Sequence, residues 1–177
     1  MNIASPEEVS TFWFSPGRRS SWYAKDDDFD AEVCRRFLAT YEAASSGQLD
    51  QWRETPQSLL SLIIVLDRFP GNMFRGSSRA FAADPQAVSL TKEGIEKGFD
   101  RTLAGTQLDF FYMPLMHSES LSDHDLLCER GRGEDPYELQ HREIIARFGR
   151  YPHRNAVLGR DSTPEEASYL TGPHESF

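Results

Sequence analysis

The chain has little cysteine, little lysine and no long apolar run, and each shortage excludes a class of protein. Among its 177 residues are two cysteines, Cys34 and Cys128, whose separation fits neither a zinc-binding spacing nor a disulfide framework. The mean hydropathy is −0.57, and no apolar run approaches the roughly 20 residues that cross a bilayer. We therefore expect a reduced, cytoplasmic protein without a membrane partner, folded as a single domain over residues 1–177.

The charge of the chain is acidic overall, but its basic residues are almost all arginine. The formal net charge of −9 argues against a nucleic-acid partner, because such binding needs a basic surface. There are 16 arginines and 3 lysines. Codon bias explains such an excess, and so does a need for guanidinium groups, which pair with carboxylate or phosphate through two parallel hydrogen bonds. The arginines concentrate in 68–79 and 142–160, which makes these segments the first place to look for a site.

Helix start signals recur along the chain. Five dipeptides place a capping residue before a proline at the first helical position: Ser5-Pro6, Thr55-Pro56, Asp84-Pro85, Asp135-Pro136 and Thr163-Pro164. Three of them are followed, three residues after the cap, by an acid that would complete a capping box: Glu8, Glu138 and Glu166. These repeated signals predict an all-α protein.

Apolar periodicity gives the extents of the helices. We expect helices at about 6–14, 27–45, 56–68, 85–98, 106–118, 122–130, 136–148 and 164–171, with a short turn near 78–82. The segment 59–66 is apolar nearly all round, which predicts a central helix. Pro114 should kink the aromatic-rich helix at 106–118 or end its first part.

An Arg-rich turn motif occurs twice, in 68–79 and in 147–160. Each copy begins Arg-Phe, contains Pro and then Asn, and has Gly four residues after that Asn. Gly76 and Gly159 at these last positions permit a positive φ or the close approach of another group.

Several segments resemble a family of uncharacterised bacterial proteins. Its opening is matched by Trp13-Phe14, Trp22-Tyr23-Ala24-Lys25-Asp26, Phe29-Asp30 and Arg36-Phe37, and its other signatures by 66–76, 112–119 and 147–155. The resemblance implies a tetratricopeptide-repeat-like fold of stacked helical hairpins, with about seven to nine helices, but no activity. The chain lacks the 34-residue consensus of true tetratricopeptide repeats. Gly71 stands where the family usually has Arg, which removes one candidate anion contact.

The two turns supply the candidate ligand-binding residues. These are Arg68, Asn72, Arg75 and Arg79 from the first turn, and Arg150, His153, Arg154 and Asn155 from the second. If the turns meet, their arginines would hold a small anionic molecule or an acidic peptide terminus. The alternative is that the arginines pair with Asp67, Asp84, Glu119 and Asp161 and lock helix ends together, and the two interpretations are compatible.

An enzyme remains a second hypothesis, and a scaffold that engages a protein partner a third. His117 and His153 are candidate bases, with Glu119 as the orienting carboxylate, and such a pair would suit a hydrolase. The run 117–125 holds two histidines and three carboxylates, which could ligate a metal or simply cap the next helix. We expect the capping role and therefore no metal or other cofactor, and no nucleophile elbow, phosphate-binding loop or dinucleotide fingerprint occurs.

Overall fold

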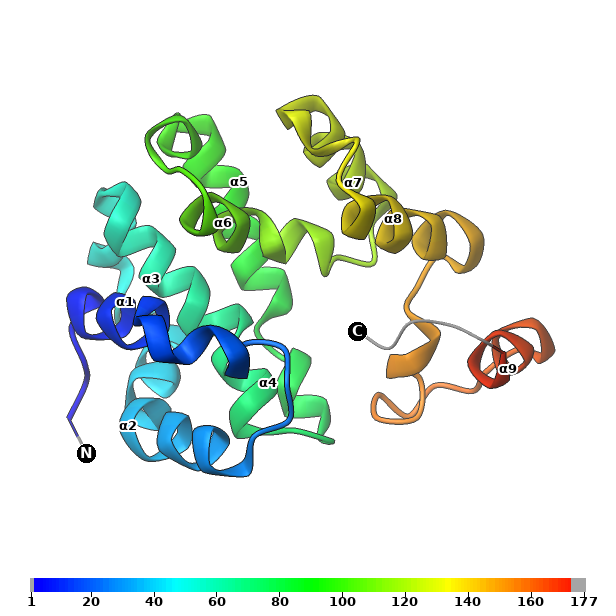
Figure 1. Ribbon diagram of the computed structural model, residues 1–177, viewed down its shortest axis with the longest axis horizontal. Helices are drawn as coiled ribbons and strands as arrows, with labels where there is room; N and C mark the ends of the chain where they lie inside the picture. The colour runs from blue at the N-terminus through cyan, green and yellow to red at the C-terminus, as the bar shows by residue number, and fades with distance from the viewer. Residues whose placement is uncertain (1, 173–177) are drawn as a thin grey trace. The chain divides into compact units, whose positions relative to one another are not determined.

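Residues 2–172 are described by the computed structural model, and their regular structure is helical throughout (Figure 1). The α-helices in this range are α1 Pro6–Phe14, α2 Asp27–Ser45, α3 Pro56–Asp67, α4 Phe69–Met73, α5 Asp84–Glu96, α6 Thr106–Met116, α7 Leu121–Leu127, α8 Pro136–Phe148 and α9 Pro164–Thr171. The prediction of an all-α fold with seven to nine helices is confirmed. The tetratricopeptide-like stacking of hairpins stays a prediction.

Three helix starts have the caps that the sequence indicates. Ser5 Oγ accepts from the N–H of Glu8, whose Oε2 accepts from the N–H of Ser5, and Thr163 and Glu166 form the same reciprocal box. Thr55 caps α3. Each bond satisfies an N–H that the first helical turn leaves without a partner, so these starts are fixed locally.

Of the other two start signals, the one at Asp84 differs from the prediction, and the one at Asp135 holds without its capping box. α5 begins at Asp84, and the residue before it, Ala83, is already close to helical at φ −100° and ψ 0°, so Asp84 is not the cap. Asp135 does cap α8 through its side chain. The side chain of Glu138, however, does not complete that box, because it binds His124 instead.

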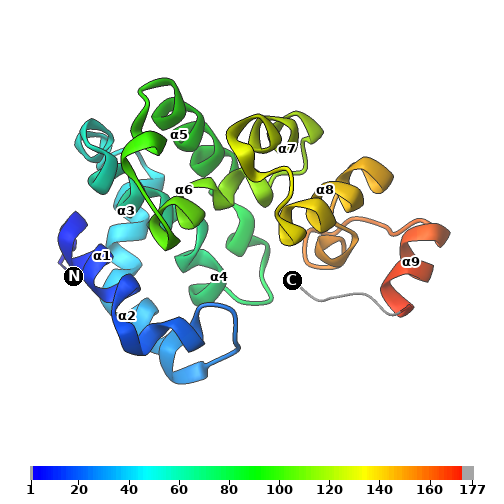
Figure 2. The same cartoon turned by 45° about the horizontal axis from the view of Figure 1, so that its top comes forward.

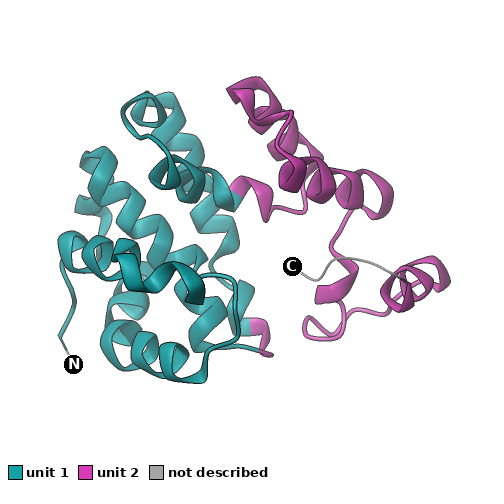
Figure 3. Ribbon diagram, viewed as in Figure 1, with its two compact units in different colours: residues 1–75, 79–114 teal, residues 76–78, 115–177 magenta. Residues whose placement is uncertain are grey.

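The chain divides into two compact units (Figure 3). Unit 1 comprises 1–75 and 79–114, and unit 2 comprises 76–78 and 115–177. The boundary falls within α6, directly after Pro114. Each unit is described below by itself, and the single domain over 1–177 stays a prediction.

α3 is the central helix of unit 1, as its apolar sequence predicts. It contacts α1, α2, α4 and α5, which surround it in both views (Figures 1 and 2). Its residues 59–67 are all buried. Aromatic rings from α1, α2, α4 and α6 pack together beside it, for example Phe37 against Phe69 with ring centroids 4.7 Å apart and Trp13 against Phe110 at 5.5 Å. This packing orders the N-terminal helices.

Unit 2 is built on the pair of α7 and α8, followed by a 3-10 turn at Pro152–Arg154 and by α9. Its apolar core contains Ile144, Ile145 and Tyr151, with Phe148 and Tyr169 packed against them. Gly149, at φ 68°, ends α8 in the left-handed conformation that glycine adopts without strain. Within residues 2–172, no helix is both long and apolar enough to cross a membrane.

Candidate functional site

The first Arg-rich turn, in unit 1, is fastened to α2 by one carboxylate. Arg75 donates two hydrogen bonds to Asp30, from Nε at 2.8 Å and from Nη2 at 3.0 Å. Asn72 Nδ2 donates to the same carboxylate at 2.7 Å. Two of the candidate ligand-binding side chains therefore hold an anion that belongs to the protein itself.

The remaining candidates of the first turn make different contacts. Arg68 Nη2 donates to the carbonyl of Trp22 at 2.9 Å, and its guanidinium lies 5.9 Å from the ring centre of Phe110. The guanidinium of Arg79 lies 3.9 Å from the ring centre of Phe74. Gly76 has the positive φ that its position in the motif predicts, at 75°.

The second Arg-rich turn, in unit 2, is anchored on Glu166. Arg150 donates to this carboxylate from Nε at 2.6 Å and from Nη2 at 2.8 Å, and Asn155 Nδ2 donates at 3.3 Å. These Arg150 hydrogen bonds, with help from the backbone N–H of Thr163, lower the pKa of Glu166 to about 2. Arg75 and Arg150 thus form the locks that the alternative interpretation describes, although with Asp30 and Glu166 as the carboxylates.

Tyr151 is contacted at every polar group by a neighbouring segment. Its hydroxyl donates to the carbonyl of Met116 at 2.5 Å, its N–H donates to Glu119 Oε1 at 2.7 Å, and its carbonyl accepts from Arg160 Nη2 at 3.2 Å. Arg160 also donates two hydrogen bonds to the Glu119 carboxylate, from Nη1 at 2.7 Å and from Nη2 at 2.9 Å. Burial raises the pKa of Glu119, but the bonds from Arg160 and Tyr151 outweigh burial and the net pKa is lowered.

Glu119 therefore does not form the histidine–carboxylate pair that the sequence suggests. Within residues 2–172, its carboxylate binds Arg160 and the Tyr151 N–H, and no histidine. This geometry removes the orienting role that Glu119 was given beside His117 or His153.

A different histidine–carboxylate pair lies in the interior of unit 2. His124 Nδ1 is 2.8 Å from Glu138 Oε1, and the two side chains are 0% and 2% exposed. His124 Nε2 is 3.0 Å from the carbonyl of Ser118. Because a carbonyl only accepts, Nε2 carries a hydrogen, and a second proton must lie between Nδ1 and Oε1 for that contact to be a hydrogen bond. The sequence did not predict this pair, because the spacing of Glu138 from Asp135 is that of a capping acid.

Four aromatic side chains of unit 2 lie in series with an arginine beside them. The ring centroids are 6.5 Å apart for His117 and His141, 5.8 Å for His141 and Tyr151, and 5.5 Å for Tyr151 and His153. The guanidinium of Arg154 lies 4.7 Å from the Tyr151 ring centre. We call these five residues the Tyr151 cluster. Tyr151, His141 and Arg154 are buried, His117 is half-buried and His153 is exposed.

The electrostatics of the Tyr151 cluster are set by burial and by positive charge. Burial lowers the pKa of His141 to about 4, although its hydrogen bond to the Tyr137 carbonyl acts against this, and the charges of His117, His124 and Arg154 lower the pKa further. Burial also raises the pKa of Tyr151 well above its ordinary value. His141 is therefore a neutral imidazole at pH 7, surrounded by groups that carry or can take positive charge.

The structure brings some predicted residues together and leaves others apart. His117, His153 and Arg154 belong to the Tyr151 cluster. Arg150 and Asn155, from the same turn as His153, donate hydrogen bonds to Glu166. The four candidates of the first turn belong to unit 1, so a site shared by both turns stays a prediction. Sequence reasoning missed His141, whose only signal is that it lies within the helix that leads into the second turn.

Metal ligation has no geometric support among the described residues. Between residues 2 and 172, no three His, Cys, Asp or Glu side chains gather closely enough to hold a metal ion. The two histidines of the run 117–125 make different contacts. His124 is buried and lies against Glu138, whereas the ring of His117 packs near that of His141.

Comparison with known proteins gives the family of the chain. Residues 9–174 match the family model described as "Bacterial protein of unknown function (DUF924)", and the chain belongs to this family. Among solved structures, it is similar to a protein of unknown function from Agrobacterium tumefaciens, with 36% identity, a TM-score of 0.88, and coverage of 94% of this chain and 96% of that chain. No curated protein matches. The resemblance to an uncharacterised bacterial family is confirmed.

Proposed function

We propose that this protein binds a small anionic molecule, such as a phosphate or carboxylate compound, at the Tyr151 cluster. The observation that carries the proposal is the series His117–His141–Tyr151–His153 with Arg154 over the tyrosine ring. Guanidinium and imidazolium groups are the usual partners of carboxylate and phosphate oxygens.

Electrostatic repulsion within the cluster supports this proposal. Burial is the main reason that a proton on His141 is disfavoured, and the charges of His117 and Arg154 lower its pKa in the same direction. An anion among them would relieve that repulsion.

The position of Tyr151 at the contact between two family signatures also supports the proposal. The segments 112–119 and 147–155, which carry two of the signatures of the family, meet at Tyr151 through Met116 and Glu119. The many hydrogen bonds of Tyr151 hold the cluster on a rigid support, and a rigid support is what a binding site needs to fix its charged groups.

Thermal denaturation with added anions tests the proposal. Phosphate, sulfate and acetate would be compared with sodium chloride at matched ionic strength, at pH 7. A ligand at ten times its Kd adds about 1.4 kcal/mol of stability, which is a rise in Tm of roughly 3–5 °C for a chain of this size.

Three variants connect that result to the cluster. His153→Ala and Arg154→Gln should reduce the anion-dependent rise by more than half. Arg147→Gln serves as the control, because Arg147 lies in the same segment but pairs with Glu165 at the surface, 2.9 Å away. If no anion exceeds the chloride effect, or if Arg147→Gln loses as much as His153→Ala, the protein does not bind anions at this cluster.

A further inference from the structure

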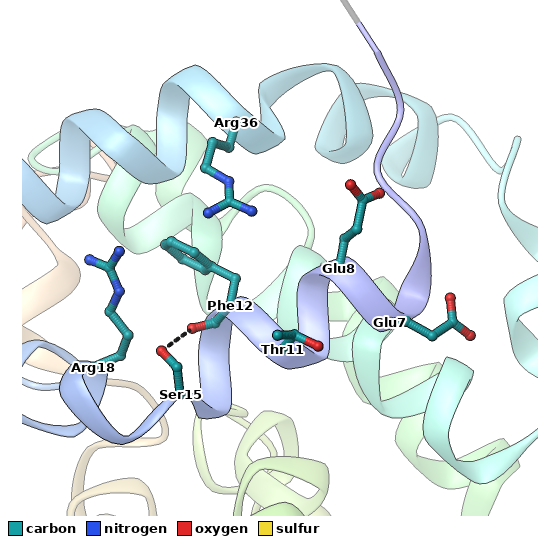
Figure 4. Close-up of a pocket in the computed structure, with 7 residues that line it drawn as sticks. All are labelled: Glu7, Glu8, Thr11, Phe12, Ser15, Arg18 and Arg36. Atoms are coloured by element: carbon teal, nitrogen blue, oxygen red, sulfur yellow. Dashed lines mark hydrogen bonds between the residues drawn. The ribbon is translucent and has the colours of Figure 1, made fainter.

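A second candidate site is a surface pocket of unit 1, formed by α1, by the turn after it and by α2 (Figure 4). The pocket has a volume of about 390 Å³. Arg18 and Arg36 lie around the ring of Phe12 at one end, and Glu7 and Glu8 lie toward the other (Figure 4). None of these residues belongs to the Tyr151 cluster.

The basic end of the pocket is held in place by stacking and by one shared carboxylate. The guanidinium carbons of Arg18 and Arg36 lie 4.8 and 4.7 Å from the ring centre of Phe12. Arg18 Nη2 donates to Glu32 Oε2 at 2.7 Å, and Arg36 Nη1 donates to Glu32 Oε1 at 3.5 Å. A guanidinium has five N–H donors, and among the described residues each of these two makes only that one hydrogen bond.

The acidic end lies on the first turn of α1. Glu7 and Glu8 are exposed, and the bond from the Ser5 N–H to Glu8 uses only Oε2. With the two arginines and Glu32, the five charged groups in and beside the pocket carry one net negative charge. The pocket as a whole therefore attracts a simple anion only weakly. A ligand with an anionic end and a cationic end is attracted by the arginines at one end and by the glutamates at the other.

The separation of the two ends sets the size of such a ligand. Glu8 and Phe12 are one helical turn apart, about 6 Å along the axis of α1. An extended peptide covers about 3.3–3.6 Å per residue, so two or three residues span the pocket. We propose that this pocket binds a short peptide by its two termini. The carboxylate takes N–H donors of Arg18 and Arg36, and the ammonium group lies beside Glu7 and Glu8.

Calorimetric titration of the full chain with defined peptides tests this proposal. The probes are Ala-Ala-Ala, its N-acetylated form, its C-terminal amide, and inorganic phosphate. The free tripeptide should bind at least about tenfold more tightly than either blocked form, because each block removes a charge-assisted hydrogen bond. Equal binding of the free and blocked peptides, or tighter binding of phosphate than of the tripeptide, would overturn the proposal.

Substitutions locate the binding in this pocket. Arg36→Gln and Glu7→Gln should each weaken tripeptide binding about tenfold, and Glu7 is a safe position because its side chain is exposed. Arg35→Gln, an exposed neighbour on α2 outside the pocket lining, should leave the affinity unchanged. His153→Ala should also leave it unchanged, which separates this site from the anion site proposed above. Loss of binding in Arg35→Gln to the same extent as in Arg36→Gln would show that the pocket is not the site.

Discussion

The neutral, buried His141 should make the stability of the protein depend on pH in a way that one substitution removes. Its pKa is lowered from the ordinary value of 6.5 to about 4, chiefly by burial. In the unfolded chain the imidazole takes a proton below about pH 6.5, while the folded chain resists that proton until about pH 4. The stability that the neutral His141 contributes is therefore fully present above pH 6.5 and is lost as the pH falls from 6.5 to about 4.

The size of the loss follows from the same values. One pKa unit corresponds to about 1.36 kcal/mol, so the fall from 6.5 to about 4 corresponds to about 3 kcal/mol. About 2 kcal/mol of this should be lost by pH 5. His141 as a whole residue is only 7% exposed, so solvent screening reduces the effect little.

Urea unfolding of the wild type and of His141→Asn, from pH 7.5 to pH 4.5, measures this contribution. The asparagine side chain keeps a donor toward the Tyr137 carbonyl, which His141 Nδ1 contacts at 2.7 Å, but it does not titrate. The variant should be less stable at pH 7.5, and its deficit should shrink by about 2 kcal/mol by pH 5. A deficit that stays constant over this range would refute the reasoning, because it would mean that His141 is not held neutral by the fold.

Two further substitutions test the packing and the buried pair. Gly94→Ala would place a Cβ 2.7 Å from the ring of Phe111, and we expect a loss of about 1–3 kcal/mol in urea unfolding; Gly17→Ala, with no atom within 4 Å, should cost far less. Glu138→Ala should lose about 3 kcal/mol or more, because it leaves the buried His124 without its partner. Glu138→Gln, whose amide can donate to Nδ1, should recover more than half of that loss, and equal losses in the two variants would contradict a shared proton between His124 and Glu138.

The helices were largely predictable, because their start signals act within a few residues. Predicted starts at Pro6, Pro56, Pro136 and Pro164 agree with the structure, since a cap and a proline act on the nearest N–H groups. The short helix α4 was missed, because Phe69-Pro70-Gly71 reads as a turn. Its helical form depends on contacts with α2 and α3, where Phe69 and Pro70 are buried.

The candidate sites were predictable only in part. The sequence pointed to His117, His153 and Arg154, because they stand in segments rich in such residues, and the structure places them around Tyr151. The bond between Arg75 and Asp30 joins residues 45 positions apart, and no local pattern specifies such a partner. The same holds for the pocket at Phe12, where Arg18 and Arg36 approach one ring from different elements.

By itself, the sequence determined the all-α class, the helix starts at Ser5, Thr55, Asp135 and Thr163, and the central place of α3. These follow from capping, proline geometry and apolar periodicity, which act over one or two helical turns. Only the tertiary structure decided which distant partners the other charged side chains bind. Glu138 could cap α8 or bind His124, and burial of the histidine favoured the second, since a buried imidazole needs a partner for both nitrogens.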